Sequence, residues 1–295
     1  MFKGIYTALV TPFKYGEVDM DSYEKMIEWQ IESGVNGLVI GGSTGEGHNL
    51  SQKEFLSLVE NAVRISKGRI KIIANTGLNS TFESIELSQA AQELNIDGIM
   101  LVAPYYVKPT QEGLYQHFKA IHDLTGLPII LYNIPSRTGV DISNETISRL
   151  AELSRIKALK DSTGNPIRCI QINQQVEIDI MAGDDSLALP YYSQGATGLI
   201  SVASNIVPSL MVQLHDLWHN SHIKEAIELQ NILYPLNEAL SCETNPVPIK
   251  YAASQFTLCS PDVRMPLSPL SERSKKLIRE TLQTLKIKLY EQPQQ

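Results

Sequence analysis

Cysteine is scarce in this sequence, with three residues in 295 and none of them spaced as CxxC. An odd number without that spacing argues against a disulfide framework, so we expect a reducing compartment. No stretch approaches the ~18 continuous apolar residues of a membrane-spanning helix. The segment MFKGIYTALVTPF has one lysine and no long apolar run before a small-residue cleavage site, so we expect no secretory signal. These shortages predict a soluble cytoplasmic protein.

Positive charge is also in short supply, since the chain has 25 basic and 32 acidic residues and a formal net charge of -7. Such a balance does not attract nucleic acid or an anionic membrane, so we expect neither as a partner. Apolar residues are plentiful at 43%, which is enough for a sizeable core. The length suits one α/β barrel, which typically needs ~250 residues.

Short apolar runs rich in β-branched residues recur along the chain, most of them about 30 residues apart, the length of one strand-plus-helix unit. There are eight, at 4–10, 37–41, 70–74, 98–103, 128–132, 156–159, 178–181 and 198–203. Amphipathic helical stretches separate them, which implies a parallel sheet with right-handed crossovers. Eight units predict a closed (β/α)₈ barrel, a TIM barrel, and an open doubly wound sheet is the structural alternative.

Several helices carry recognisable start and stop signals. Ser51 and Glu54 have the spacing of a capping box before an apolar helical stretch, and Ser80 and Glu83 repeat it. Gly34 is placed as a glycine that ends a helix. These signals support the alternation of helices with strands.

The β signal stops near residue 205, and only helical patterns follow. We interpret 209–220 as the helix that completes the barrel, and 223–241 and 271–290 as appended helices. The chain is therefore predicted to consist of a barrel over 1–224 and a C-terminal helical region over 225–295.

Unusual residues gather where the predicted strands end. In a (β/α)₈ barrel the chemistry lies at the carboxyl ends of the strands. The segments that meet at that rim are 41–47, 103–106, 132–139, 158–164 and 183–185.

Lys160 directly follows a mostly apolar strand, so it should emerge at the mouth of the barrel. Desolvation there disfavours the ammonium form and leaves an amine that can attack a carbonyl. The resulting Schiff base is an electron sink that lets a keto acid lose a proton. The competing interpretation is a strand-end lysine paired with Asp161 or with solvent.

Other polar groups at this rim suit the same chemistry. Tyr132 ends the neighbouring strand and could shuttle protons, helped by the hydroxyls of Ser43 and Thr44, or it could simply pack. The run 41–47 lacks the lysine of a P-loop, so its backbone N–H groups favour a small carboxylate over a nucleotide, unless it is an ordinary turn. Arg137 suits bidentate binding of a carboxylate, although surface arginines are common.

Two further groups carry weaker signals. His215, His219 and His222 lie at i, i+4 and i+7 of a predicted helix, where one face could hold a metal. No HExxH motif or paired carboxylate accompanies them, so we favour a polar helix face. Asp184 and Asp185 are expected to cap the helix that follows the seventh strand.

The motifs GGSTGEG, APYY, YNIPSRTG, LKDSTGN, AGDD and GLISV occur in the order and spacing of the dihydrodipicolinate synthases. The chain resembles that family from ALVTPF to NPVPIK. The family belongs with the N-acetylneuraminate lyases and other pyruvate-dependent class I aldolases. The resemblance implies condensation of pyruvate with L-aspartate 4-semialdehyde to 4-hydroxy-tetrahydrodipicolinate, in diaminopimelate and lysine biosynthesis. It also implies a homotetramer, a dimer of dimers, without metal or organic cofactor.

The resemblance also assigns roles to residues of this chain. Lys160 would form the Schiff base with pyruvate, and Tyr132 would donate and accept protons. Thr44 would link Tyr132 in a proton relay to Tyr106 of a neighbouring subunit.

Substrate binding is assigned in the same way. Backbone groups of Ser43 and Thr44 would hold the pyruvate carboxylate, and Arg137 the carboxylate of the second substrate. Gly183 and Ile200 would line the pocket through their main chains. Ser43 stands where most members have threonine, but it keeps the hydroxyl, so we expect activity to survive.

A lysine-binding regulatory site is known at the dimer interface of many bacterial members. Asn79, Glu83 and Tyr105 match that site. Four positions depart from its usual residues: Gly47, His48, Gln52 and Phe55. We therefore predict weak or absent inhibition by lysine.

Two other functions stay open at this point. The chain could be a lyase for N-acetylneuraminate or another keto sugar acid, but Arg137 within YNIPSRTG favours a second substrate with a carboxylate. It could instead be a catalytically silent binding protein, against which the joint presence of Lys160, Tyr132, Thr44 and Tyr106 argues.

Overall fold

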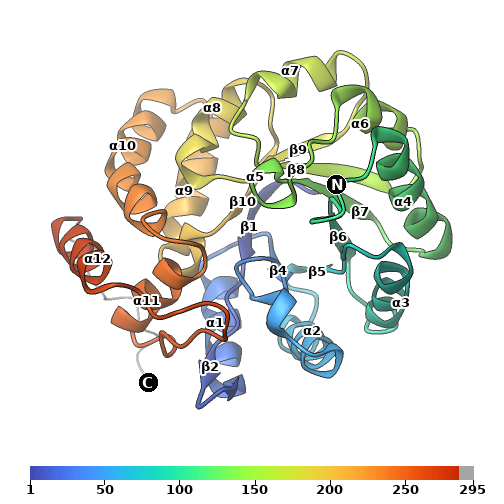
Figure 1. The fold of residues 1–295 in the computed structure, drawn as a ribbon. Helices are drawn as coiled ribbons and strands as arrows, with labels where there is room; N and C mark the ends of the chain where they lie inside the picture. Colours follow the sequence, from blue (N-terminus) through green and yellow to red (C-terminus); the bar gives the residue numbers. More distant parts are fainter. Residues whose placement is uncertain (286–295) are drawn as a thin grey trace.

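Eight parallel strands form a closed barrel in the computed structural model, which describes residues 1–285 (Figure 1). The order around the barrel is β1-β10-β9-β8-β7-β6-β5-β4, so the last strand pairs with the first. The strands are β1 (Gly4–Ala8), β4 (Gly37–Ile40), β5 (Lys71–Asn75), β6 (Gly98–Val102), β7 (Ile129–Asn133), β8 (Ile156–Asp161), β9 (Asp179–Ala182) and β10 (Gly198–Ser201). The predicted barrel is confirmed, and the open sheet is wrong.

Helices form an outer ring around these strands, except α5 (Pro135–Thr138), a single turn that lies over the barrel in the view of Figure 1. Those of the ring are α1 (Met20–Glu32), α2 (Gln52–Ser66), α3 (Thr81–Gln92), α4 (Gln111–Leu124), α6 (Asn144–Ala151), α7 (Ile167–Asn173), α8 (Ala188–Ser193) and α9 (Pro208–His219). Short 3₁₀ turns lie at η1 (Gly47–Asn49), η2 (Asp185–Leu187) and η3 (Ala203–Asn205). No helix in residues 1–285 has the length and apolar character needed to cross a membrane.

The helix signals in the sequence are largely realised. Ser51 and Glu54 form a complete capping box at the start of α2. Ser80 accepts the Glu83 N–H at 3.3 Å without the return bond, so the second box is half formed. Gly34 follows α1 with φ of +82°, in the left-handed region that glycine adopts without a Cβ clash.

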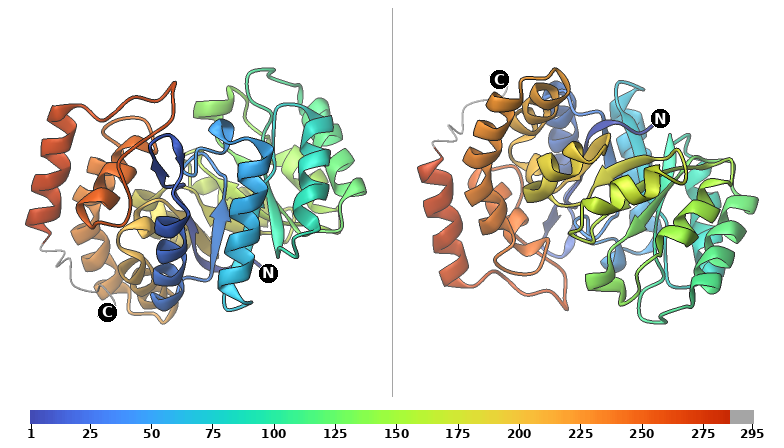
Figure 2. Two further views of the ribbon diagram at one scale, coloured as in Figure 1. Left: turned by 90° about the horizontal axis from the view of Figure 1, so that it is seen from below. Right: turned by 90° about the horizontal axis from the view of Figure 1, so that it is seen from above.

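The C-terminal helices pack along one side of the barrel (Figure 2). They are α10 (Ile223–Leu240), α11 (Val247–Gln255) and α12 (Glu272–Thr284). The predicted helix over 271–290 is seen as far as residue 284, and its part beyond 285 lies outside the described residues. The division at 224/225 stays a prediction, and it falls just inside the start of α10.

Several short elements were not predicted, among them α5 and the three 3₁₀ turns. Strands β2 (Phe13–Lys14) and β3 (Glu17–Val18) form a hairpin, and α11 was also missed. Two-residue strands are too short to show a period, and α11 begins in a proline-rich segment. The hairpin turns at Tyr15 and Gly16, which both have positive φ.

The buried apolar side chains form two layers. One lies between the strands and the helices, and the other fills the inside of the barrel. The inner layer contains Phe2, Tyr6, Ala8, Val39, Ile73, Met100, Ile130, Tyr132, Ala158, Met181 and Ile200. Since alternate residues of a strand face the same side, Lys160 points inward like Ala158, at the end of β8.

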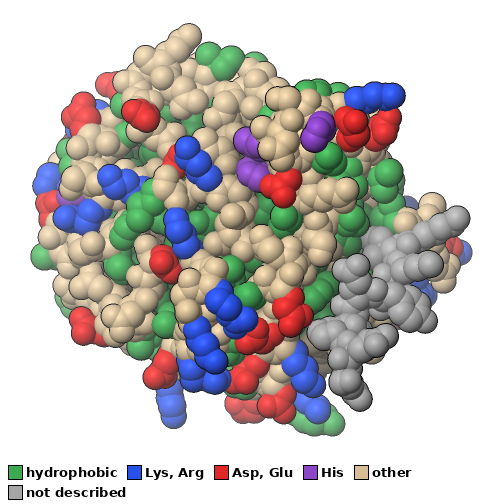
Figure 3. Space-filling view, turned by 180° about the vertical axis from the view of Figure 1, so that it is seen from behind, with side chains coloured by type: hydrophobic (Ala, Val, Ile, Leu, Met, Phe, Trp, Pro, Cys, Tyr) green, Lys and Arg blue, Asp and Glu red, His purple; other side chains and the backbone are tan. Residues whose placement is uncertain are grey.

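The molecular surface carries both signs of charge. On the face shown in Figure 3, Lys and Arg side chains are interspersed with Asp and Glu. That face therefore does not present a field of one sign.

Candidate active site

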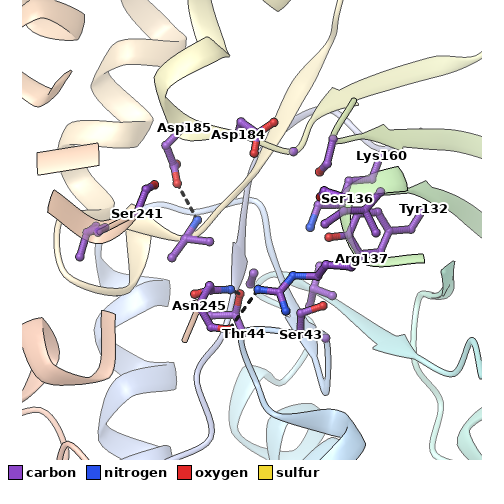
Figure 4. A pocket seen from close by; sticks show the side chains of 18 of the residues that line it. Ser43, Thr44, Tyr132, Ser136, Arg137, Lys160, Asp184, Asp185, Ser241 and Asn245 are labelled. Carbon is purple, nitrogen blue, oxygen red and sulfur yellow. Dashed lines mark hydrogen bonds between the residues drawn. The ribbon is translucent and has the colours of Figure 1, made fainter. Parts of the chain in front are cut away.

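A cavity of about 320 Å³ lies at the carboxyl ends of the barrel strands (Figure 4). Its wall combines strand-end residues with residues from the C-terminal region. The predicted site residues on this wall are Ser43, Thr44, Tyr132, Arg137, Lys160 and Gly183. The structure thus brings together six side chains or main chains that are spread over 140 residues of sequence.

Lys160 lies on the wall of this cavity with 6% of its surface exposed. It is paired in register with Tyr132 of β7, and its Nζ lies 4.0 Å from the centroid of the Tyr132 ring. An amine and a phenol are therefore adjacent inside the barrel mouth, in surroundings largely free of solvent.

The competing interpretation of Lys160, an ion pair with Asp161, is wrong. Asp161 points to the other face of β8, where its carboxylate accepts hydrogen bonds from Thr163 Oγ1 and Tyr191 OH, both at 3.0 Å. Arg168 Nε lies 3.8 Å from the same carboxylate. Burial raises the pKa of Asp161, and Arg168 opposes that shift. Lys160 is left facing the cavity.

Thr44 is tied to the C-terminal region. Its Oγ1 accepts a hydrogen bond from Asn245 Nδ2 at 2.9 Å, and Asn245 O accepts one from Arg137 Nη2 at 3.1 Å (Figure 4). Asn245 therefore bridges the two elements that are predicted to hold the carboxylates of the substrates. Sequence reasoning missed this residue, although it begins the NPVPIK segment in which the family resemblance ends.

A buried ion pair anchors the loop that carries Ser43 and Thr44. Glu46 Oε1 lies 2.7 Å from Lys250 Nζ of α11, and both side chains are 0% exposed. The other oxygen of Glu46 accepts the Arg264 N–H at 3.0 Å. Burial lowers the pKa of Lys250, and the Glu46 carboxylate opposes that shift. The loop is thus fixed from α11 and from the segment beyond it.

The predicted capping role of Asp184 and Asp185 is wrong. Neither side chain caps η2 or α8. Asp185 instead binds the start of η3, where it accepts hydrogen bonds from Ser201 Oγ and from the N–H groups of Val202 and Ala203, the last two at 2.9 and 3.0 Å. These donors lie just after β10. The sequence did not predict this contact, because no local pattern indicates a partner 16 residues away.

Asp184 lines the cavity itself. It follows β9, the strand next to the one that carries Lys160. Burial raises the pKa of its carboxyl group, and the positive charge of Lys160 opposes that shift. Asp184 is therefore an acidic group of the cavity wall, whereas the sequence analysis expected it to cap a helix.

Gly183 and Ile200 differ in their relation to the cavity. Gly183 lines it, and a Cβ there would lie 1.8 Å from Ser162 Oγ and 3.0 Å from Asp161 O, so a larger residue would require Ser162 to move. Ile200 is fully buried in the inner layer of the barrel and is not among the described residues of the cavity wall. Its predicted lining role therefore gains no support from the geometry of the single chain.

Tyr106 is the predicted relay residue that the single chain does not bring to the cavity. It is 87% exposed, with φ of +72°. Thr44 and Tyr132, the other two members of the relay, both lie on the cavity wall. The relay stays a prediction that requires a second subunit.

The predicted regulatory residues lie outside the cavity wall. Burial raises the pKa of Tyr105, on which the Asn79 backbone and the Glu83 carboxylate also act, so these three are neighbours. His48 is exposed, and partial burial lowers its pKa. A lysine site at these positions stays a prediction.

The histidines of α9 make contacts of their own. The rings of His215 and His219 lie 3.9 Å apart, and His215 Nδ1 is 3.2 Å from the hydroxyl of Tyr192. Burial lowers the pKa of His215 to about 4. Within residues 1–285 no cluster of three ligating side chains is arranged to hold a metal ion.

Comparison with known proteins places this site in a family. The sequence model described as the Dihydrodipicolinate synthetase family matches residues 1–285. The 4-hydroxy-tetrahydrodipicolinate synthase of Rickettsia bellii (strain OSU 85-389) is 43% identical over 291 residues, which cover 98% of this chain and 99% of that protein.

Solved structures agree with the sequence comparison. The 4-hydroxy-tetrahydrodipicolinate synthase from Methylacidiphilum fumariolicum SolV superposes with a TM-score of 0.95 at 42% identity, covering 97% of this chain and 96% of that one. The chloride-inhibited dihydrodipicolinate synthase from Acinetobacter baumannii, complexed with pyruvate, has a TM-score of 0.93 at 43% identity, with 97% and 99% covered. This chain belongs to the dihydrodipicolinate synthetase family.

Proposed function

We propose that this chain condenses pyruvate with L-aspartate 4-semialdehyde through a Schiff base and releases 4-hydroxy-tetrahydrodipicolinate, in the diaminopimelate route to lysine. One observation carries the mechanism: the Nζ of Lys160 lies 4.0 Å from the ring centroid of Tyr132 inside the cavity. The activity is that of a lyase of the class I aldolase type.

The amine of Lys160 starts the reaction. It attacks the keto carbon of pyruvate, water leaves, and an iminium forms whose positive nitrogen withdraws electrons from the neighbouring methyl group. Loss of a methyl proton gives an enamine, which attacks the aldehyde carbon of the second substrate. The iminium supplies the electron sink, so we propose no metal or organic cofactor.

Tyr132 is the residue we propose for proton transfer. It is 4% exposed and lies beside the amine, so its hydroxyl can serve the carbinolamine and the enamine without bulk water. Thr44 lies on the same wall, held by Asn245. We propose that Tyr106 of a neighbouring subunit completes the relay, since this side chain is 87% exposed in one chain.

Two anion-binding elements explain the choice of substrates. The backbone of Ser43 and Thr44, in a loop anchored by Glu46, suits the carboxylate of pyruvate. Arg137 lines the mouth of the cavity and suits the carboxylate of aspartate semialdehyde. A sugar-acid lyase whose second substrate is a polyol would have no carboxylate for this guanidinium.

The assembly we propose is a homotetramer, a dimer of dimers, working in the cytoplasm. The exposed position of Tyr106 supports contact with another subunit, because the predicted relay is incomplete in one chain. Sedimentation of the purified protein tests this assembly. Full activity of an isolated monomer would exclude a role for Tyr106 in trans.

The decisive experiment compares Lys160→Ala with Lys157→Ala. Lys157 lies on the same strand but is exposed, so it controls for the loss of a lysine from β8. We expect Lys160→Ala to lose both turnover and borohydride-trapped pyruvate, since no other amine lines the cavity within residues 1–285. Lys157→Ala should retain both.

Two outcomes would contradict the proposed function. Turnover of pyruvate with N-acetylmannosamine, and none with aspartate semialdehyde, would mean a sugar-acid lyase. No trapped adduct on the wild-type protein would mean a silent binding protein.

A further inference from the structure

The proposed mechanism uses none of the carboxylates on the cavity wall. Three acidic residues line the cavity among the described residues: Asp184, Asp185 and Glu243. Each is a carboxylate able to bind a positively charged group of a substrate, so their hydrogen bonds decide which one is available.

Two of the three carboxylates already accept hydrogen bonds from other parts of the protein. Asp185 accepts hydrogen bonds from Ser201 Oγ and from two backbone N–H groups after β10. Glu243 Oε1 accepts from the N–H and the Oγ of Ser271, at 3.2 and 2.6 Å, which lowers its pKa. Both carboxylates serve to hold loops in place.

Asp184 differs from both. No hydrogen bond or ion pair to its carboxylate occurs within residues 1–285, and it lies partly buried on the wall of the cavity. It follows β9, the strand next to β8, and Lys160 is the positive group whose charge acts on it. A partly desolvated carboxylate without a partner is costly, which makes it a good acceptor for a cation.

The second substrate brings the matching charge. Aspartate semialdehyde has a carboxylate and an ammonium on the same carbon, with the aldehyde two carbons away. In Figure 4 Arg137 and Asp184 lie on different sides of the cavity, below and above in that view, with Lys160 on a third. Arg137 thus offers a positive group for the carboxylate and Asp184 a negative group for the ammonium beside it, while the enamine on Lys160 meets the aldehyde carbon at the other end.

We propose that Asp184 binds the ammonium group of the second substrate and takes its proton before the ring closes. This assignment rests on the proposed function. It makes Asp184 a catalytic residue for cyclisation, whereas Lys160 and Tyr132 serve formation of the carbon–carbon bond.

During ring closure Asp184 takes up one proton and later returns it. An N–H bond of the substrate ammonium breaks, and its proton forms an O–H bond with Asp184. The freed lone pair attacks the iminium carbon, and the iminium π electrons move onto the Lys160 nitrogen. The new ring nitrogen passes one of its two protons to that nitrogen, the bond from carbon to Lys160 breaks, and the ring C=N bond forms in its protonated state, which then gives its last proton to water. Asp184 then gives its proton to the departing amine, which leaves the carboxylate ionised and Lys160 as its ammonium.

The test uses Asp184→Asn, which removes the charge and nearly preserves the shape, with two aldehydes. Aspartate semialdehyde carries the amino group, and succinate semialdehyde has the same carboxylate and aldehyde without it. We expect kcat/KM for aspartate semialdehyde to fall by roughly 100-fold or more, as for loss of a general base. Condensation with succinate semialdehyde, followed by the mass of the borohydride-reduced protein, should change less than about twofold.

Further variants separate the proposal from a structural effect. Asp216→Asn makes the same change on the exposed side of α9 and should leave every measurement unchanged. Trapping of pyruvate by Asp184→Asn should match the wild type, which shows that the site is folded. Asp184→Glu, which restores the charge, should regain part of the lost rate. Should Asp184→Asn not fold, Asp184→Ser is measured in the same way.

Two results would overturn the assignment of Asp184. One is unchanged turnover of aspartate semialdehyde by the variant. The other is an equal loss with both aldehydes, which would place Asp184 in the carbon–carbon step or in the structure. A wild-type protein that traps pyruvate but does not use aspartate semialdehyde would instead refute the proposed function itself.

Discussion

Replacing Lys250 by methionine is expected to destabilise this protein far more than the loss of an ordinary ion pair. The Nζ of Lys250 lies 2.7 Å from Glu46 Oε1, and both side chains are 0% exposed. Removing the cation leaves a buried carboxylate whose Oε1 has lost its donor, while Oε2 keeps the Arg264 N–H. Breaking a buried pair in this way costs about 3–5 kcal/mol.

The size of the effect can be judged against a surface pair in the same protein. Lys224 Nζ and Glu228 Oε1 are 3.9 Å apart, with side chains 86% and 62% exposed. Lys224→Met should therefore change the free energy of unfolding by less than about 0.5 kcal/mol. Urea denaturation of the two variants and the wild type, at fixed protein concentration, gives both numbers.

A double variant tests whether the unpaired carboxylate of Glu46 causes the loss of stability. Glu46→Gln with Lys250→Met leaves a neutral amide in place of the carboxylate, so it should be more stable than Lys250→Met alone. A loss below about 1 kcal/mol for Lys250→Met would refute the reasoning. So would a double variant that is less stable than the single one, because burial of an unpaired charge would then not be the main cause of the lost stability.

Three other expectations can be measured with the same protein. The hydrogen bonds of Arg264 hold the pKa of Glu54 at about 2, below its usual 4.5, so their stabilisation is complete above pH 4.5 and is lost as the pH falls towards 2. Glu54→Gln should cost about 1–2 kcal/mol at pH 7 and little near pH 2 in denaturant titrations, and a gap that is constant with pH would contradict this. Asn245→Ala removes the bond to Thr44 Oγ1 and keeps the main-chain bond to Arg137, so kcat/KM should fall by about fivefold, and an unchanged value would show that the bond is idle. Lysine should inhibit weakly or not at all in an activity titration, and half-inhibition well below millimolar would refute that prediction.

The strands of this fold could be predicted because each is a short apolar run with a clear boundary. Buried parallel strands are apolar on both faces, and their recurrence every 30 residues or so indicates a barrel. Lys160 could be singled out for the same reason, as a polar residue that ends such a run. The strands and Lys160 could therefore be predicted from neighbouring residues alone.

The features that escaped prediction depend on distant parts of the chain. Asp185 binds the backbone after β10, and Asn245 reaches Thr44 across 201 residues of sequence. Helix capping is a local rule, and here a tertiary contact prevailed over it. The partner of Lys250 could not be predicted either, because neither helical spacing nor composition links α11 to the loop after β4.

The bridge made by Asn245 has a consequence for how this protein is made. A nascent chain that has emerged as far as residue 201 already contains every strand of the cylinder. It still lacks the side chain that holds Thr44 and the carbonyl that holds Arg137. A ribosome-bound or truncated product of that length therefore contains all eight strands and Lys160 but lacks the part of the cavity wall that residues 237–245 supply, so we expect it to be inactive until those residues are present.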